Sequence, residues 1–576
     1  MSVKFEELYE TDELEDLNEL LAQLPDVDEL EGFTTVYNRA RTLFCDDSTL
    51  LDEFAALKTH LERVLFMSEL QVVKDALNNL KCIRQTPAEL NPTQLPNQTP
   101  AELNPTQLPN QLKSTNVPPL LLGGPNKKYP HMSKAIEVKS SKSEGRYLAA
   151  VQRISPGDVL IVDKPYITSL FPAHYSSHCL ACFKRLSEDF LKCPSCLKVR
   201  FCDTSCYTSC FKKTHKWECE VLELIDNDEI GRMAAMAYRI VSQTGFEFLS
   251  SISDKLGRSE GTYTEGDYLA VYNQVDNMEL RPTGDHLKRC FTALYLAKCL
   301  ELVGWFHGKP SKDNFLFVAA LLVKHIQACA CNAYEINEFV KKGESMINSE
   351  SLELGGAVYP TISLSNHSCN GNTSRTNYGI YCVVRATRSI QPSEKVYDNY
   401  GQFYHIESKE ERQKRLKLQY FFDCSCAACK QNWPLYRVFS GQTSVYKCPG
   451  CGGSLGTQVD KIKRCGKCKK ELKGLVKLII HLNKLKSDFR KIMDGITPEN
   501  ANDYIKTYSI LLTQIEKIFS PPCRELTECT QVLLQSYAVL GNHSQISPTL
   551  EESQVALFQG AGSDDDDDDD EVPGLI

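Results

Sequence analysis

Cysteine and histidine residues at metal-ligand spacing are the strongest chemical signal in this sequence. Between residues 179 and 219 they form four pairs: Cys179 and Cys182, Cys193 and Cys196, Cys202 and Cys206, and His215 and Cys219. Eight soft ligands are the number that two tetrahedral zinc ions need. Because this segment is short and has little apolar content, we expect metal binding to supply most of its folding free energy. The spacing alone allows either sequential or interleaved pairing.

A second set of cysteines follows the same rule further along the chain. Cys448 and Cys451, then Cys465 and Cys468, are two C-x-x-C pairs separated by thirteen residues. This is the spacing of a small zinc ribbon, so we expect one more zinc ion here. The lysines around these pairs form a basic edge, which we interpret as a solvated face.

Residues 365–372, with the sequence Ser-Asn-His-Ser-Cys-Asn-Gly-Asn, combine polar groups suited to a cofactor with a cysteine. A β-like run at residues 396–401 contains Tyr400, and a C-x-C-x-x-C cluster at residues 424–429 comes after it. This order of an Asn-His-Ser-Cys motif, a tyrosine-bearing strand and a short cysteine cluster resembles the catalytic half of SET-domain lysine methyltransferases.

The cysteine-rich segment at residues 179–219 is similar to MYND zinc fingers, including the Phe201-Cys202 pair and the surroundings of His215 and Cys219. This resemblance implies interleaved pairing, with Cys179, Cys182, Cys202 and Cys206 on one ion and Cys193, Cys196, His215 and Cys219 on the other. A MYND finger between the two parts of a SET domain is the arrangement of the SET and MYND (SMYD) family. The additional cysteine pairs near the C-terminus fit its fourth subfamily best.

The resemblance also implies a set of site residues. Tyr400 and Tyr420 would be catalytic, with the Tyr400 hydroxyl directed at the transferred methyl group and Tyr420 in the wall of the lysine channel. S-adenosylmethionine would contact Gly145, Arg146, Tyr147, Asn277, Asn332, Asn366, His367, Tyr400 and Phe422. Cys369, Cys424, Cys426 and Cys429 would bind a third, structural zinc ion that holds Tyr420 and Phe422 over the site.

This sequence departs from the family pattern at three places. Gly371 stands where a proline usually follows the Asn-His-Ser-Cys motif, Tyr147 replaces a glycine, and residues 393–395 read Ser-Glu-Lys in place of Gly-Glu-Glu. Because Asn372 is retained, we expect the chain crossing of the SET fold to form.

Lysine methylation makes defined physical demands on such a site. A neutral amine attacks a sulfonium methyl group, so a lysine whose free pKa is about 10.4 must be deprotonated, aligned and desolvated. A narrow, dry channel lowers that pKa, and holding the two reactants together contributes on the order of 7–11 kcal/mol. Neither a nucleophilic residue nor a catalytic metal is required.

Composition excludes several classes of protein. The chain has 576 residues, a net charge of −9 and 25 cysteines. The negative charge argues against a protein that coats nucleic acid. The acidic N-terminus has no apolar segment typical of a signal peptide, and we find no apolar run of about 18 residues that would cross a membrane. Paired cysteines in an intracellular chain are typical of zinc binding.

Periodicity and composition predict the remaining elements. Residues 1–84 should form two to four helices packed on the main body as a cap. The identical sequences at residues 85–97 and 98–110 are too proline-rich for regular structure and predict an extended linker. Runs at residues 146–151 and 159–163, around a Pro-Gly turn, predict a hairpin. Helices are expected within residues 220–345 and, near the C-terminus, at residues 475–493, 499–519 and 524–540.

The predicted fold is α+β and multidomain, a β-rich SET fold split by a MYND finger and a helical insert and followed by a zinc ribbon and helices. The expected divisions are an acidic helical region (1–84), a linker (85–130), the first SET part (131–178), the finger (179–219), the helical insert (220–330), the SET core (331–402), the post-SET zinc segment (403–430), the ribbon (445–470), the C-terminal helices (471–545) and a disordered acidic tail (546–576).

The predicted function is that of a protein-lysine N-methyltransferase that uses S-adenosylmethionine and carries four zinc ions. Its main partner would be a protein with a target lysine, histone or not, and its MYND finger is expected to bind proline-rich peptides. A monomer in the nucleus and cytoplasm is expected, without a membrane or nucleic-acid partner. The alternative is a MYND-mediated scaffold or transcriptional co-repressor with a weak or inactive SET domain.

Overall fold

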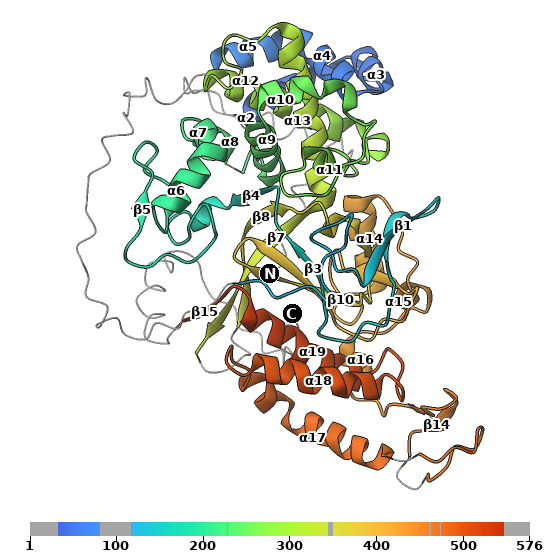
Figure 1. Cartoon of the computed structure of the whole chain (residues 1–576). Coiled ribbons are helices and arrows are strands. Elements are labelled where there is room, and N and C mark those ends of the chain that lie inside the picture. Colours follow the sequence, from blue (N-terminus) through green and yellow to red (C-terminus); the bar gives the residue numbers. More distant parts are fainter. Residues whose placement is uncertain are drawn as a thin grey trace, which may run out of the picture.

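The computed structural model describes residues 33–80, 117–226, 228–343, 349–459, 462–472 and 474–546. In Figure 1 a helical lobe, a β-rich centre and a C-terminal helical region follow one another from top to bottom, and a cysteine-rich finger projects at one side. The fold is therefore α+β, as the sequence predicts. Residues 1–32, the tandem repeat and the acidic tail after residue 546 lie outside the described residues.

The described part of the N-terminal region consists of helices α2 (Phe33–Asp46), α3 (Ser48–Ala56), α4 (His60–Glu69) and α5 (Gln71–Asn79). A capping box formed by Thr59 and Glu62 starts α4, because each side chain accepts a hydrogen bond from the other's backbone N–H. The ring of Phe33 lies 5.2 Å from that of Phe291 in the helical insert. The expected helical cap on the main body is confirmed for these residues.

The finger and the helical insert follow one another between the SET strands. The finger contains β5 (Leu191–Lys192), β6 (Arg200–Phe201), α6 (Thr204–Cys210), the short π-helix η4 (Phe211–His215) and α7 (Lys216–Glu218). The insert contains α8 (Leu222–Ile225), α9 (Arg232–Thr244), α10 (Phe246–Ser251), α11 (Tyr268–Tyr272), α12 (Thr283–Leu302) and α13 (Lys312–Asn332). The expected helices are therefore present.

Helix α13 is long and apolar enough to cross a membrane by length and composition alone, although we expected no such run from the sequence. In the structure 67% of its most apolar window is buried inside the protein. It packs between α9, α12 and α4, so its apolar surface is accounted for by the core of the helical lobe.

The β-rich centre is built from three sheets of three or four strands. The first has the order β1 (Ile136–Ser141), β2 (Gly145–Ala150), β12 (Lys395–Asp398) and β9 (Asn366–His367). The second has the order β10 (Thr373–Tyr378), β11 (Tyr381–Ala386) and β3 (Val159–Asp163). The third has the order β15 (His543–Ile546), β7 (Ala333–Lys342), β8 (Glu350–Val358) and β4 (Ile167–Leu170).

The hairpin predicted between residues 146–151 and 159–163 is wrong. Its turn does form, since the Asp158 N–H donates to the Ser155 carbonyl at 3.1 Å and Gly157 has a φ of 93°. However, β2 pairs with β1 along one edge and with β12 along the other. Because both edges of β2 already have backbone partners, β3 pairs with β11 instead.

The chain crosses β12 at residues 366–372. Asn372 Nδ2 donates to the Lys395 carbonyl at 2.8 Å, and the Tyr397 N–H donates to Asn372 Oδ1 at 2.7 Å. A Cβ atom on Gly371 would lie 3.3 Å from the carbonyl oxygens of Tyr397 and Asp398, so glycine suits this close approach. The crossing therefore forms with glycine in the family's proline position, as expected.

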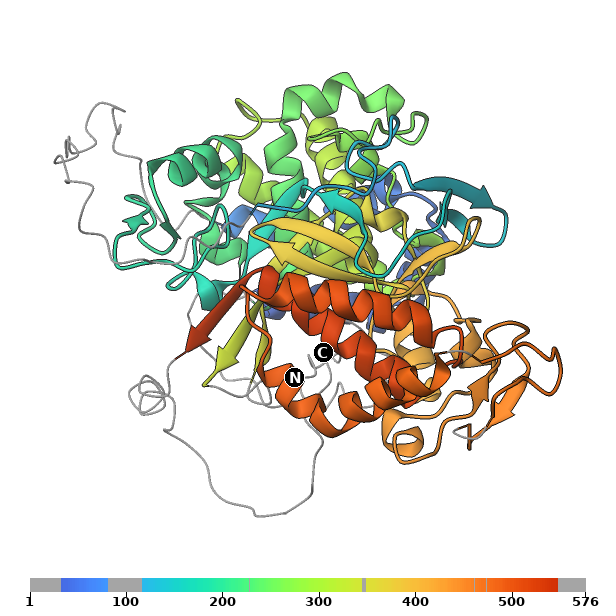
Figure 2. The ribbon, with the colours of Figure 1, turned by 60° about the horizontal axis from the view of Figure 1, so that its bottom comes forward.

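The C-terminal half adds short helices, a ribbon and three long helices. These elements are α14 (Lys409–Tyr420), α15 (Ala427–Lys430), α16 (Tyr436–Phe439), β13 (Tyr446–Lys447), β14 (Ser454–Gly456), α17 (Leu475–Asp494), α18 (Ala501–Ile515) and α19 (Arg524–Leu540). The three predicted long helices are confirmed, the second with shorter bounds. Strand β15 then pairs in parallel with β7, where Figure 2 shows the red strand beside the yellow-green one. The sequence did not predict this strand.

A buried arginine joins the finger to the insert. Arg239 of α9 is 2% exposed, and it donates to Glu218 Oε2 at 2.7 Å and to Asp226 Oδ2 at 2.5 Å. Burial opposes its charge, but the two carboxylates outweigh burial and raise the pKa of Arg239 well above its usual range. Loss of this guanidinium would leave two buried carboxylates without a countercharge.

Replacing Arg239 with methionine should therefore lower the free energy of unfolding by about 3–5 kcal/mol. Denaturant unfolding followed by circular dichroism measures this change. Lys198→Met is the matched control, since it breaks an ion pair with Glu223 whose side chains are 44% and 48% exposed. That control should cost at most about 1 kcal/mol. Equal losses in the two variants would contradict the proposed importance of the buried pair.

Candidate active site

The cysteine and histidine residues singled out in the sequence gather in four groups that could hold metal ions, and within each group the ligand atoms lie within 4.8 Å of one another. The groups are Cys179, Cys182, Cys202 and Cys206; Cys193, Cys196, His215 and Cys219; Cys369, Cys424, Cys426 and Cys429; and Cys448, Cys451, Cys465 and Cys468. In the finger the grouping is interleaved, as the MYND resemblance implies.

In the second group, the carboxylate of Glu218 orients the ring of His215. His215 Nδ1 lies 3.2 Å from Glu218 Oε1, while its Nε2 lies 3.2 Å from Cys193 Sγ. Glu218 is in turn held by Arg239. A carboxylate behind a ligating imidazole fixes the ring so that its other nitrogen faces the metal position. The buried pair that joins the finger to the insert thus also supports this group.

The third group draws together two distant parts of the chain. Cys369 Sγ lies 3.5 Å from Cys429 Sγ, and both residues are buried. The Gln413 side chain of α14 holds the backbone of Cys424 on both sides, donating to its carbonyl at 2.7 Å and accepting from its N–H at 2.9 Å. This group therefore fixes α14 against the Asn-His-Ser-Cys motif.

Tyr400 lies where these segments meet. Its hydroxyl donates to the Ser365 carbonyl at 2.6 Å, and its N–H donates to His367 Nδ1 at 3.0 Å. The centre of its ring lies 5.3 Å from that of His367 and 4.8 Å from that of Tyr420. Burial raises the pKa of Tyr400 above its usual range, so the phenol is neutral near pH 7. Burial likewise lowers the pKa of His367, to about 4.

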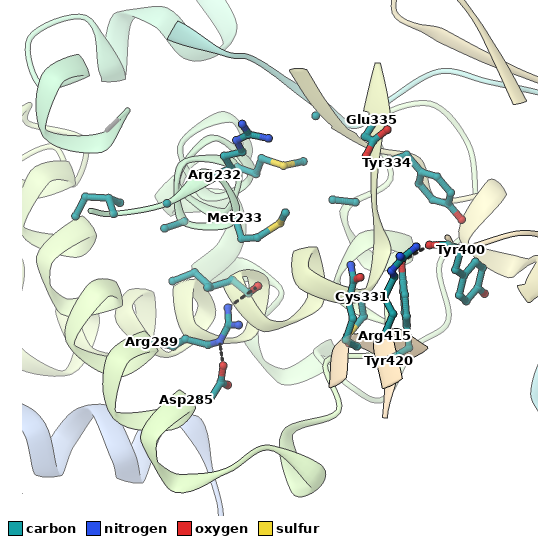
Figure 3. Close-up of a pocket in the computed structure, with 18 of the residues that line it drawn as sticks. Arg232, Met233, Asp285, Arg289, Cys331, Tyr334, Glu335, Tyr400, Arg415 and Tyr420 are labelled. Carbon is teal, nitrogen blue, oxygen red and sulfur yellow. Dashed lines mark hydrogen bonds and ion pairs between the residues drawn. The ribbon is translucent and has the colours of Figure 1, made fainter. Parts of the chain in front are cut away.

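A cavity of about 700 Å³ opens at Tyr400 and Tyr420. Figure 3 shows Tyr334, Tyr400 and Tyr420 together at one end of it and Arg232 and Arg289 at the other. The tyrosines come from β7, from the segment after β12 and from the end of α14. The residues that line the cavity include neither Asn366 nor His367. Tyr400 therefore contacts the motif on one side and the cavity on the other.

The other predicted cofactor residues lie outside the cavity lining, and those of β2 and β9 lie near one another. Asn366 Nδ2 donates to the Glu144 carbonyl at 3.2 Å, next to Gly145, which has a φ of 62°. Arg146 Nη2 donates to the Asn273 carbonyl at 3.4 Å.

The two aromatic residues Tyr147 and Phe422, predicted for the cofactor, are half-buried beside these strands. The ammonium group of Lys395 lies 4.6 Å from the centre of the Tyr147 ring. The centre of the Phe422 ring lies 6.0 Å from that of His367. Phe422 thus lies on the same side of Tyr400 as His367.

Asn277 and Asn332 lie close together, but their amide groups are already engaged. Asn332 Nδ2 donates to the carbonyls of Val275 and Ala328 at 2.7 and 2.8 Å, which makes it part of the end of α13. Asn277 Nδ2 donates to Cys331 Sγ at 3.4 Å. The side-chain NH2 groups of these asparagines therefore serve the protein in this conformation, and a cofactor contact would use their oxygens or backbone.

The segments that carry the predicted cofactor residues are nevertheless connected into one region. Gln274 Nε2 donates to Ser363 Oγ at 2.8 Å, and the Arg281 guanidinium lies 5.1 Å from the centre of the Phe421 ring. Asn399 Nδ2, beside Tyr400, is buried and has no hydrogen-bond partner among the described residues. The Asn399 amide donor, the asparagine side-chain oxygens, backbone groups and the Phe422 ring suit a ligand with an adenine and an amino-acid end, so the donor set fits S-adenosylmethionine.

Sequence reasoning missed three residues at the tyrosine end of the cavity. Tyr334 and Arg375 line it, and Asp398 forms an ion pair with Arg375. The only signal in the sequence is that Arg375 and Asp398 place opposite charges in two strand-like runs, one shortly after Gly371 and one shortly before Tyr400. Nothing in that pattern indicates that the two strands meet.

Comparison with known proteins finds SET-domain proteins among the matches. A SET domain model matches residues 145–401. Protein-lysine N-methyltransferase SMYD4 of Danio rerio is 22% identical over 417 residues, which cover 57% of this chain and 54% of that protein. The Homo sapiens SMYD4 is 24% identical, with 59% and 51% covered. N-lysine methyltransferase SMYD2 of Gallus gallus is 28% identical, with 51% and 59% covered. This chain thus spans about half the length of these relatives.

Among solved structures, Rubisco LSMT bound to AdoMet is 15% identical, covers 73% of this chain and 87% of its own, and has a TM-score of 0.21.

The SET match extends from β2 to the residue after Tyr400 and includes the finger and the helical insert. The sequence relatives SMYD4 and SMYD2 carry the name of the SET and MYND family, which the motifs of this chain resemble. The chain is therefore a SET-domain protein related to the SMYD4 and SMYD2 lysine methyltransferases.

Proposed function

We propose that this chain is a protein-lysine N-methyltransferase that uses S-adenosylmethionine. The observation that carries the proposal is the position of Tyr400, which contacts His367 on one side and lines the 700 Å³ cavity on the other. A methyltransferase needs such a boundary between its cofactor and its substrate lysine. The family relationship supports the same reaction.

The residues that would hold the cofactor come from β2, β9, the end of α13 and the segment after α14. They include Gly145, Asn366, His367, Asn332 and Phe422. When bound, S-adenosylmethionine would supply a methyl group on a sulfonium, whose C–S electron pair stays on sulfur as the lysine nitrogen forms the new N–C bond.

The chain's own residues would align and desolvate the lysine. Tyr400 is held by Ser365 and His367, so its hydroxyl has a fixed position before substrate enters. The Tyr420 hydroxyl donates to the Tyr400 carbonyl at 3.3 Å, which locks the two rings together. Aromatic walls exclude water from the amine and favour its neutral form.

The four metal groups are proposed as structural zinc sites. Each supplies four cysteine or histidine ligands and so leaves no open position of the kind a catalytic zinc keeps. The proposed substrate is a protein with an exposed lysine, as the names of the relatives suggest. Binding of proline-rich peptides by the finger, a monomeric state and a nuclear and cytoplasmic location belong to the same proposal.

Calorimetry with S-adenosylmethionine, followed by methyl transfer from the labelled cofactor to a cell lysate, tests the function. Cofactor binding together with transfer to proteins supports the enzyme. Absence of both would leave the scaffold with an inactive SET domain.

Replacing Tyr400 with phenylalanine should lower the transfer rate on the order of 10²-fold, because it removes a fixed polar group beside the reacting atoms. Initial rates with the labelled cofactor measure the loss. Tyr404→Phe is the control, since Tyr404 is buried against Trp433 and does not line the cavity. A rate that stays at the wild-type level in Tyr400→Phe would remove the proposed role of this residue.

Replacing Cys426 with serine should lower both the zinc content and the transfer rate, because the third group positions Tyr420 and Phe422. Elemental analysis of the wild type should give four zinc ions per chain, one for each group. Cys451→Ser in the ribbon should lower the zinc content and leave the transfer rate unchanged. Cys210→Ser, whose thiol lies beside Thr214 and in no metal group, should change neither. Full activity of Cys426→Ser after loss of one zinc would contradict this account.

A further inference from the structure

Arg375 lines the cavity beside the tyrosines and forms an ion pair with Asp398. The reaction as proposed gives this ion pair no role. Arg375 of β10 pairs with Asp398 of β12, and its Nη1 also donates to the Asn399 carbonyl at 3.4 Å. The guanidinium carbon lies 4.9 Å from the centre of the Tyr334 ring. Arg375 therefore belongs to the same end of the cavity as Tyr400.

The cation of this pair faces the cavity, whereas the anion does not. The side chain of Arg375 is 34% exposed and that of Asp398 is 5% exposed. Arg375 lines the cavity, and Asp398 is not among the lining residues. Because Arg375 lines the cavity and Asp398 does not, a side chain that reaches the tyrosines meets the positive member of this pair first. The lining at this end also holds Glu335 and the ion pair of Arg415 with Glu407, whose two charges offset each other.

The other titratable groups that face Arg375 come from β7, β11, the loop after β8, the segment after β12 and the end of α14. They are Tyr334, Glu335, Cys382, Tyr359, Tyr400 and Tyr420. Burial raises the pKa of the four tyrosines and of Cys382 above the usual range, so these groups are neutral near pH 7. Glu335 lines the cavity next to Tyr334 and is exposed, so solvent screens its charge in part.

We propose that Arg375 is a positioning residue that selects the neutral form of the substrate amine. This inference rests on the proposed methyltransferase function. A lysine ammonium at Tyr400 would bring a second positive charge beside the guanidinium in the cavity wall, which lowers the pKa of that ammonium. Its proton passes to water as the side chain enters, and the nitrogen lone pair becomes available for attack.

The pH dependence of kcat reports the ionisation of the bound complex, so it tests this assignment. The probe is a lysine peptide from a protein that the lysate assay shows to be methylated. Arg375→Gln should move the acid limb of the kcat profile to higher pH by about one unit or more. Arg375→Lys keeps the charge and should leave the limb near its wild-type position. Asp398→Asn removes the countercharge and should move the limb to lower pH.

Arg232→Gln is the matched control, because Arg232 is a cation in the lining of the same cavity but lies at its far end, over Phe171 at 4.1 Å. Its acid limb should stay in place. Shifts of opposite sign in Arg375→Gln and Asp398→Asn cannot come from a merely structural role, which would lower rates without moving the limb. Thermal melting checks folding, and Arg375→Met replaces Arg375→Gln where the glutamine variant does not fold.

Proton release gives a readout that does not depend on turnover. Protein loaded with S-adenosylhomocysteine is titrated with the same peptide at about pH 7.5, in two buffers of different ionisation enthalpy. The wild type should release close to one proton for each peptide bound, and Arg375→Gln should release fewer. An active wild type whose acid limb and proton release are unchanged in Arg375→Gln would overturn the role of Arg375. A wild type that transfers no methyl group would instead overturn the proposed function.

Discussion

The site depends on the crossing of the chain at residues 366–372 with β12. In this crossing β9 and β12 run in parallel, with Asn366 opposite Tyr397 and His367 opposite Asp398. The Asn372 amide bonds to the backbone of β12 at both Lys395 and Tyr397 and is fully buried. A buried amide with both its donor and its acceptor satisfied by backbone is expensive to displace, so the register of the two segments is fixed.

Several functional groups follow from that register. Tyr400 lies two residues beyond β12 and can reach His367 only because β9 lies alongside. Cys369 lies two residues beyond β9, and its position brings it to the thiols of Cys424 and Cys429. The metal group then holds the end of α14, which places Tyr420 on Tyr400. The crossing thus positions the predicted cofactor residues, the tyrosines of the cavity and the third metal group together.

Local patterns predicted much of this arrangement. The twelve metal-ligand positions of the finger and the ribbon could be recognised because pairs at short spacing point their side chains at one ion, whatever the rest of the chain does. The third group was recognised by resemblance. The long helices were recognisable from apolar periodicity. Tyr400 and the Asn-His-Ser-Cys motif were recognisable by resemblance.

Contacts between distant segments were not predictable in the same way. The runs on either side of the turn at residues 155–158 have strand character, but the partner of each was decided by β12 and β11, more than 200 residues later. Strand β15 has four residues, and its pairing with β7 joins positions about 200 apart. The Arg375–Asp398 pair also depends on such a meeting of strands. In these cases tertiary pairing, which local sequence does not encode, decided the outcome.

The charge at the tyrosine end of the cavity bears on the product as well as on the substrate. In the proposed reaction, methylation leaves the lysine nitrogen protonated, so the product in the cavity would again be a cation beside Arg375. The interaction that favours the neutral amine on entry therefore weakens binding of the methylated ammonium once transfer is complete. A second transfer requires that ammonium to lose its proton, which the same guanidinium also favours, while departure to water relieves the repulsion. In the proposed reaction the charge of Arg375 therefore acts twice, by supplying the neutral amine for transfer and by speeding the departure of a product that stays charged.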